Sequence, residues 1–278
     1  WPFFIEADKG HKIEVSVGNK NYRLKKKSRS NGRFDNWIRL EDSVVRSSAT
    51  QTDDGRYVLK YSLSTNHPQS PKVECESELL SCDGWSVISD IDDTIKDSCV
   101  TNRRELLMNT FVRKFQCIEG MAEVYSNWQD SGANFHYVSS SPWQLFDSLM
   151  AMQEEFNFPL GTMHLRNFRL RDQFLSKVMM RKKGKASQIK RLIKNLPRHK
   201  FLLIGDSGEK DPEIYQKISR KFPNQIKGIF IRDLEDRPML LDRVDKMRKS
   251  AGTSYCSVFS TSDELLEQAA PIVDKLAI

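Results

Sequence analysis

Three carboxylates stand close together in the stretch WSVISDIDDTIKDS, which runs from Trp85 to Ser98. Asp90, Asp92 and Asp93 follow a short apolar run that predicts a buried strand. Neighbouring carboxylates repel one another, so holding them together costs free energy unless a cation lies beside them. A hard divalent cation such as Mg²⁺, bound by one or two carboxylates and a substrate phosphate, meets that requirement. Taken alone, the stretch is also compatible with a plain acidic turn.

Other polar residues follow apolar runs further along the chain. Ser139 and Ser140 follow NFHYV, and Lys185 opens a stretch with helical periodicity. Asp206 and Asp211 follow the run KFLLI. In an open α/β sheet the site lies outside the carboxyl ends of the strands, so we expect these side chains to gather there. Together they supply what phosphoryl transfer requires: a nucleophile, an acid–base group, phosphate donors, a positive charge and metal ligands.

The sequence pattern changes near Gly84, which predicts two domains, 1–83 and 84–278. Before this point, short alternating runs such as 12–17 and 56–62 are separated by turn signals. That pattern predicts a small β-rich domain, an antiparallel sandwich or barrel. From Gly84 onward, short apolar strands alternate with helical stretches, which predicts an α/β domain with a parallel sheet.

The elements of the second domain are predicted from apolar periodicity and from capping residues. We expect helices over 103–115, 120–129 and 185–196, and strands over 134–138, 162–165, 200–204, 226–232 and 255–259. Ser141 and Asp211 are expected to cap helices whose first residues are prolines. Thr261 with Glu264 predicts a capping box for the last helix.

Composition indicates a globular protein with a net charge of +7. No run approaches the roughly 18 apolar residues of a transmembrane helix, so we expect no membrane span. Basic clusters begin at Arg23 (RLKKKSR) and Arg181 (RKKGK). They suit nucleic acid, an anionic membrane surface or a phosphorylated substrate, and a solvated basic face explains the first cluster as well. The scattered cysteines contain no C-x-x-C pair, which predicts reduced thiols in a cytosolic protein.

Four motifs together resemble those of the haloacid dehalogenase superfamily, in the same order. They are Asp90-x-Asp92-x-Thr94, Ser139, Lys185 and Gly205-Asp206-x4-Asp211. Three longer segments are similar in sequence to the catalytic domain of the actin-patch-protein type of phosphatidate phosphatase: DIDDTIKDS, YVSSSPWQL and LLIGDSGEKDPEIY. That family also carries a β-rich segment before its first motif. The resemblance covers about residues 84–278 and implies a haloacid-dehalogenase-like, Rossmann-type parallel sheet. The gaps between motifs hold no full cap domain, so we expect a minimal cap and an open site.

The resemblance implies catalytic and metal-binding roles for the matching carboxylates. Asp90 would be the nucleophile, and Asp92 would protonate the leaving alkoxide and later deprotonate water. Thr94 would support the turn between them. Mg²⁺ would be held by Asp90, the backbone carbonyl of Asp92, Asp206, and Asp211 through a water molecule.

The resemblance also implies which residues bind the phosphoryl group. The hydroxyl of Ser139 and the N–H of Ser140 would hold its oxygens, although Ser140 could replace Ser139. Lys185 would neutralise the nucleophile and the phosphate. Lys182 and Lys183 compete for this role, but only Lys185 opens the amphipathic helix.

The resemblance implies a phosphatase acting on phosphatidate, or on another anionic lipid, at a membrane surface. It implies a cytoplasmic protein with peripheral membrane association and no nucleic-acid partner, and it specifies no protein partner. Two alternatives stay open: the same chemistry on a phosphoprotein or soluble phosphomonoester, and a non-catalytic lipid-binding module. The presence of all four motif carboxylates argues against the module.

Overall fold

The computed structural model describes residues 9–29, 32, 34, 36–52, 55–67, 69–97, 115–166, 184–250 and 254–277. The chain divides into two compact units, Trp1–Ser81 and Cys82–Ile278. The helix expected over 103–115 lies outside the described residues except at Phe115, and Lys182 and Lys183 lie outside them too. Among the described helices, none combines the length and apolarity needed to span a membrane.

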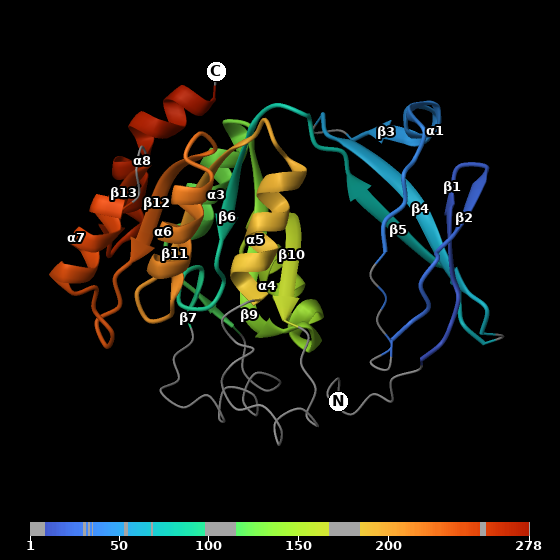
Figure 1. Cartoon of the computed structure of the whole chain (residues 1–278), viewed down its shortest axis with the longest axis horizontal. Helices are drawn as coiled ribbons and strands as arrows, with labels where there is room; N and C mark the ends of the chain where they lie inside the picture. Colours follow the sequence, from blue (N-terminus) through green and yellow to red (C-terminus); the bar gives the residue numbers. More distant parts are fainter. Residues whose placement is uncertain are drawn as a thin grey trace. The chain divides into compact units, whose positions relative to one another are not determined.

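The first unit is built on one antiparallel sheet (Figure 1). Its elements are β1 (Ile13–Val17), β2 (Lys20–Arg23), α1 (Asp42–Ser48), β3 (Ala49–Gln51), β4 (Tyr57–Thr65) and β5 (Val73–Glu78). Strand β4 pairs with β1 and β3 along one edge and with β5 along the other. Alternate residues of β1 are buried, as expected of a strand with one covered face. The described strands thus form a single open sheet rather than a sandwich or barrel, and α1 was not predicted.

The second unit contains the predicted α/β fold, with a six-stranded parallel sheet in the order β10-β9-β6-β11-β12-β13. Its strands are β6 (Trp85–Ser89), β9 (Ala133–Pro142), β10 (Gly161–Arg166), β11 (Lys200–Asp206), β12 (Ile226–Arg232) and β13 (Tyr255–Phe259). The chain builds outward from β6 to β10, then returns to β11 and builds in the other direction (Figure 1). The strand order therefore reverses between β6 and β11, the place where such sheets bind ligands.

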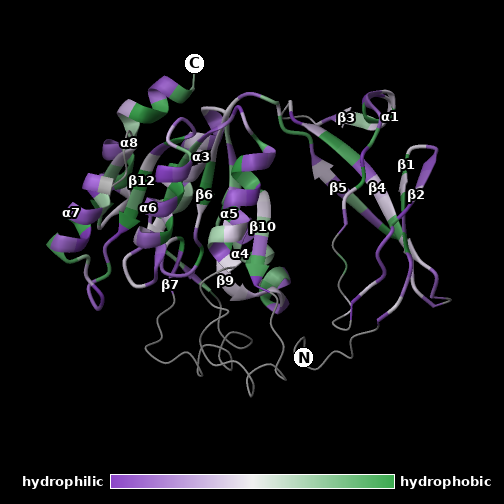
Figure 2. Cartoon of the chain, viewed as in Figure 1, coloured by the Kyte–Doolittle hydropathy of each residue, from purple (hydrophilic) through white to green (hydrophobic). Residues whose placement is uncertain are grey.

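Helices cover both faces of this sheet. One core contains side chains of α5 (Gly184–Asn195), α6 (Asp211–Lys221) and α7 (Leu241–Ser250). The other contains side chains of α3 (Met121–Asp130), η1 (Trp143–Leu145), α4 (Phe146–Glu155) and α8 (Ser262–Leu276). Strand β6 is buried throughout, with Val87 in one core and Ile88 in the other, because successive strand side chains point to opposite faces. Figure 2 shows hydrophobic strands between helices with many hydrophilic residues.

A separate two-stranded sheet pairs β7 (Lys96–Asp97) with β8 (Gln116–Cys117). Strand β7 directly follows the first motif in sequence. The chain between its strands, 98–114, and the segment 167–183 lie outside the described residues. The minimal cap expected from the motif spacing therefore stays a prediction.

Two predicted helix starts are wrong. Strand β9 continues through Pro142, so Ser141 belongs to a strand and caps no helix. Helix α6 begins at Asp211 itself, which is therefore not its N-cap. In both cases the side chain is engaged elsewhere: Ser141 Oγ donates to Asp92, and Asp211 accepts from Lys185. A side chain that satisfies a buried charge is not free to cap a helix.

Candidate active site

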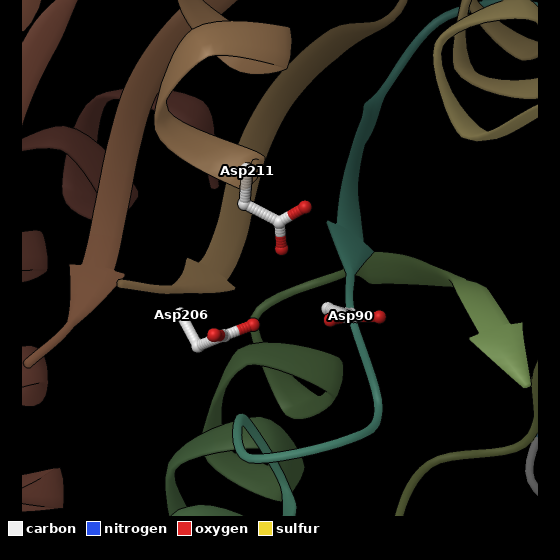
Figure 3. Close-up of side chains that lie close together, drawn as sticks. All are labelled: Asp90, Asp206 and Asp211. Atoms are coloured by element: carbon white, nitrogen blue, oxygen red, sulfur yellow. The ribbon is translucent and has the colours of Figure 1, made fainter. Parts of the chain in front are cut away.

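Three of the predicted carboxylates meet at the carboxyl edge of the parallel sheet (Figure 3). Asp90 follows β6, Asp206 ends β11 and Asp211 begins α6. One oxygen from each carboxylate lies within 4.8 Å of the others, and all three residues are buried. The amide of Asp90 also donates to the carbonyl of Ile204 at 2.9 Å, which ties the first motif to β11. The two strands at the reversal in strand order thus bring these side chains together.

Lys185 lies against two of these carboxylates, Asp90, the predicted nucleophile, and Asp211. It is buried in the first turn of α5, with Nζ 3.0 Å from Asp90 Oδ2 and 2.5 Å from Asp211 Oδ1. Burial lowers the pKa of Lys185, but Asp211 and Asp90 outweigh burial and raise that pKa above its ordinary value. Lys185 is therefore a protonated ammonium group at neutral pH.

The residues of this cluster fit a divalent cation. Three carboxylates face one ammonium. Burial and then Asp211 raise the pKa of Asp206 to about 7, although Lys185 opposes this rise. Burial likewise raises the pKa of Asp90, although Lys185 opposes this. Among the described residues no donor reaches Asp90 Oδ1, Asp206 Oδ2 or Asp211 Oδ2, all buried. Converging carboxylate oxygens without donors are the ligands that hard cations such as Mg²⁺ and Ca²⁺ take.

The carboxylate of Asp92 has a different set of partners. Its Oδ2 accepts from Ser139 Oγ at 2.9 Å and from Ser141 Oγ at 2.5 Å, and Oδ1 lies 2.6 Å from Lys96 Nζ. Burial raises the pKa of Asp92, but Lys96 and the two hydroxyls outweigh burial, and the pKa of Asp92 lies below its ordinary value. The side chain is therefore an ionised carboxylate. The predicted metal contact of Asp92, through its backbone carbonyl, stays a prediction.

The two remaining predicted residues, Thr94 and Ser140, differ in exposure. Thr94 is fully buried, and its Oγ1 has no hydrogen-bond partner within the described part of the chain. Its role in supporting the first-motif turn stays a prediction. Ser140 is exposed, and its Oγ donates to Glu209 Oε2 at 3.4 Å. Ser139, by contrast, is buried and contacts Asp92. The two serines that the sequence left as alternatives therefore differ in exposure and in hydrogen-bond partner.

Sequence reasoning missed several residues that hold the site together. Lys96 pairs with Asp92 four residues earlier, and this spacing of opposite charges was visible in the first motif. Ser141 was assigned to a helix cap instead. Arg237 donates to Asp93 from 144 residues away at 2.9 Å, and no local pattern connects such distant positions.

Fold and site together define an α/β protein of the doubly wound type. Its carboxylate–lysine cluster lies at the reversal in strand order, as a cation and phosphate site would. The comparison of sequences specifies the family. The chain belongs to the family described as "Phosphatidate phosphatase APP1, catalytic domain", which matches residues 85–233, more than half of the chain.

Two curated relatives come from yeasts. Phosphatidate phosphatase APP1 of Saccharomyces cerevisiae is 40% identical over 154 residues, which are 54% of this chain and 26% of the relative. An uncharacterised protein of Schizosaccharomyces pombe is 35% identical over 164 residues, 57% of this chain and 27% of the relative. The chain thus spans about a quarter of the length of each relative.

Two solved structures have low similarity to the chain. An uncharacterised protein from Listeria monocytogenes serotype 4b has a TM-score of 0.44 and 10% identity, covering 69% of this chain and 99% of its own. A HAD family hydrolase from Deinococcus radiodurans, with bound phosphate and sodium, has a TM-score of 0.37 and 11% identity, covering 69% and 98%. Because these TM-scores are low, the fold is assigned from the strand order of this chain and not from these two structures.

Proposed function

We propose that this chain is a Mg²⁺-dependent phosphatase of the haloacid dehalogenase type, which hydrolyses phosphatidate to diacylglycerol and inorganic phosphate. The observation that carries the proposal is the buried cluster of Asp90, Asp206, Asp211 and Lys185, all within the family match. The net charge of +7 suits an anionic lipid surface. The protein would work in the cytoplasm, in peripheral contact with a membrane.

Asp90 is the proposed nucleophile. One of its oxygens forms a bond to phosphorus while the bond from phosphorus to the alkoxide of diacylglycerol breaks, which gives an aspartyl-phosphate. Lys185, 3.0 Å from Asp90 Oδ2, opposes the rise in the pKa of Asp90 that burial causes, and it offsets charge on the phosphoryl oxygens. Asp90, Asp206 and Asp211 would hold Mg²⁺, which supplies Lewis-acid stabilisation of the phosphoryl group.

Asp92 is the proposed acid and base. In the second step it accepts a proton from the water that attacks the aspartyl-phosphate, and its lowered pKa suits an ionised base. In the first step it must carry a proton for the leaving alkoxide. A phosphoryl dianion bound at Ser139 would raise the pKa of Asp92, because a nearby like charge disfavours the ionised form. Substrate binding would thus prepare Asp92 for the first step.

Phosphate release from phosphatidate in mixed micelles tests the proposal, with Mg²⁺ or a chelator and beside a soluble phosphomonoester and a phosphopeptide. We expect Mg²⁺-dependent release mainly from phosphatidate. Release mainly from the soluble ester or the phosphopeptide would keep the chemistry and discard the lipid substrate. Folded protein that releases phosphate from none of them would contradict the enzyme assignment and favour a lipid-binding module.

A further inference from the structure

Asp93, inside the first motif, has a left-handed backbone conformation, with a φ of 56°. Aspartate adopts this conformation more often than most residues with a Cβ, but glycine takes it without the steric cost of a Cβ. The turn folds the chain back on itself, so that the amides of Ile95 and Lys96 both donate to the carbonyl of Ile91 at 3.0 Å. It also brings Lys96 Nζ to Asp92 Oδ1. The conformation of Asp93 thus fixes the surroundings of Asp92.

Two arginines hold Asp93 from outside the motif. Arg232, the last residue of β12, donates through Nη1 to the Asp93 carbonyl at 3.0 Å. Arg237, in the turn that follows, donates through Nη2 to Asp93 Oδ2 at 2.9 Å. The backbone of Arg237 is fixed by its own N–H, which donates to Leu234 at 3.0 Å. The main chain of Asp93 is therefore anchored to the last residue of β12, and its side chain to the turn that follows.

Arg237 also contacts the loop that carries the metal-binding carboxylates. A Cβ placed on Gly208 would come within 2.5–2.9 Å of three guanidinium atoms of Arg237, so the guanidinium lies directly over this glycine. The Arg237 carbonyl accepts from Ser207 Oγ at 2.8 Å. Gly208 and Ser207 lie between Asp206 and Asp211. A single residue therefore touches both loops of the site.

We infer that Arg237 is a positioning residue, which holds Asp93 in its left-handed conformation and so places Asp92 for proton transfer beside Asp90. Arg237 lies outside the family match, which ends at residue 233. The role of Asp92 in proton transfer rests on the proposed function, whereas the hold of Arg237 on the backbone of Asp93 does not. The arginine compensates for a residue other than glycine at a position that requires a positive φ.

A rescue experiment separates this role from general stabilisation. Arg237→Ala should lower kcat about 10-fold and change KM by less than about 2-fold. Asp93→Gly should restore kcat in that background to within about 3-fold of the Asp93→Gly single variant, because glycine needs no clamp. Arg198→Ala is the matched control. Arg198 precedes β11, away from the site, and its Nε lies 2.8 Å from Asp83 Oδ1 in an exposed ion pair that the substitution removes. It should leave kcat unchanged.

Hydrogen exchange gives a second result that needs no substrate. The amides of Ile95 and Lys96 should exchange at least about 10-fold faster in Arg237→Ala, and Asp93→Gly should restore their protection. If wild-type protein hydrolyses no phosphatidate, the proposed function fails, and exchange alone decides the inference. Arg237→Lys, which keeps the charge and one donor, replaces Arg237→Ala if that variant does not fold.

Three results would overturn the inference. A rise in KM at constant kcat would make Arg237 a substrate-binding residue. Failure of Asp93→Gly to restore kcat or exchange protection would show that Arg237 acts through something other than the backbone of Asp93. Unchanged kinetics and exchange in Arg237→Ala would leave it no role in the site.

Discussion

At the scale of single residues, the buried carboxylates of the site repel one another without a cation. In wild type, the Glu209 amide donates a hydrogen bond to Asp206 Oδ1 at 2.9 Å. Asp206→Asn removes one of the charges and keeps an oxygen to accept this hydrogen bond. We expect the metal-free variant to be more stable than metal-free wild type by about 1 kcal/mol, or about 2–4 °C in Tm. We also expect Mg²⁺ to raise the Tm of wild type but not of the variant. Thermal melts with and without Mg²⁺ measure both effects, and an undiminished Mg²⁺ shift would exclude Asp206 as a ligand.

The carboxylates and lysine of the cluster could be predicted because each stands at the end of an apolar run or the start of a helix. The turn that joins Asp92 to Lys96 could not. The spacing of these two charges is visible in the sequence, but the left-handed turn at Asp93 is not, because aspartate gives no signal of the kind that glycine gives. Arg237 reaches this turn from a different strand, and the pairing is visible only in three dimensions.

At the scale of elements, strands β9 and β10 share a histidine pair that should make folding sensitive to acid. His136 Nδ1 lies 2.7 Å from Thr162 Oγ1, which lies 2.9 Å from His164 Nε2. Burial, followed by His164, lowers the pKa of His136 to about 4. The unfolded chain, with a pKa near 6.5, binds the proton more strongly. The free energy of unfolding should therefore fall as pH drops from about 6.5 towards 4, by about 2 kcal/mol at pH 5 from His136.

Urea unfolding of wild type and His136→Asn at pH 7 and pH 5 measures this contribution. Asp206 has the opposite effect, because its raised pKa makes the folded state bind the proton more strongly between about 4 and 7. Asp206 contributes equally to the free energy of unfolding of wild type and variant, so its contribution cancels when the two are compared. We expect a smaller loss of stability at pH 5 in the variant, and an equal loss in both would show that His136 is not responsible.

Elements buried on both sides were the easiest to predict, because a parallel strand covered by helices is a short apolar run. Strands β11, β12 and β13 appear where expected, and Thr261 caps α8 by accepting from the Glu264 amide at 3.3 Å. The error at β9 has a tertiary cause. Pro142 pairs with Arg166 of β10, so the strand includes the proline that was predicted to start a helix.

At the scale of the whole molecule, the second unit holds every described residue of the candidate site. We expect residues 82–278 alone to fold and to hydrolyse water-soluble, short-chain phosphatidate with kcat within about 3-fold of the full chain. Circular dichroism and phosphate release on both proteins check this. A folded but inactive fragment would show that the β-rich unit takes part in catalysis.

The parallel sheet could be predicted from the alternation of strands and helices, whereas the arrangement of the first unit could not. Short alternating strands with turns are common to sandwiches, barrels and single sheets. What separates these is the pairing of the long β4 with three other strands, which no strand pattern specifies.

The central claim is that Asp90 takes the phosphoryl group from phosphatidate. The most direct test is an acid quench of the protein during turnover of phosphate-labelled phosphatidate with Mg²⁺, followed by mapping of labelled peptides. We predict label on the peptide that contains Asp90, release of that label by hydroxylamine, and none in Asp90→Asn. Phosphate release without labelled protein, or label and turnover that survive in Asp90→Asn, would contradict the account.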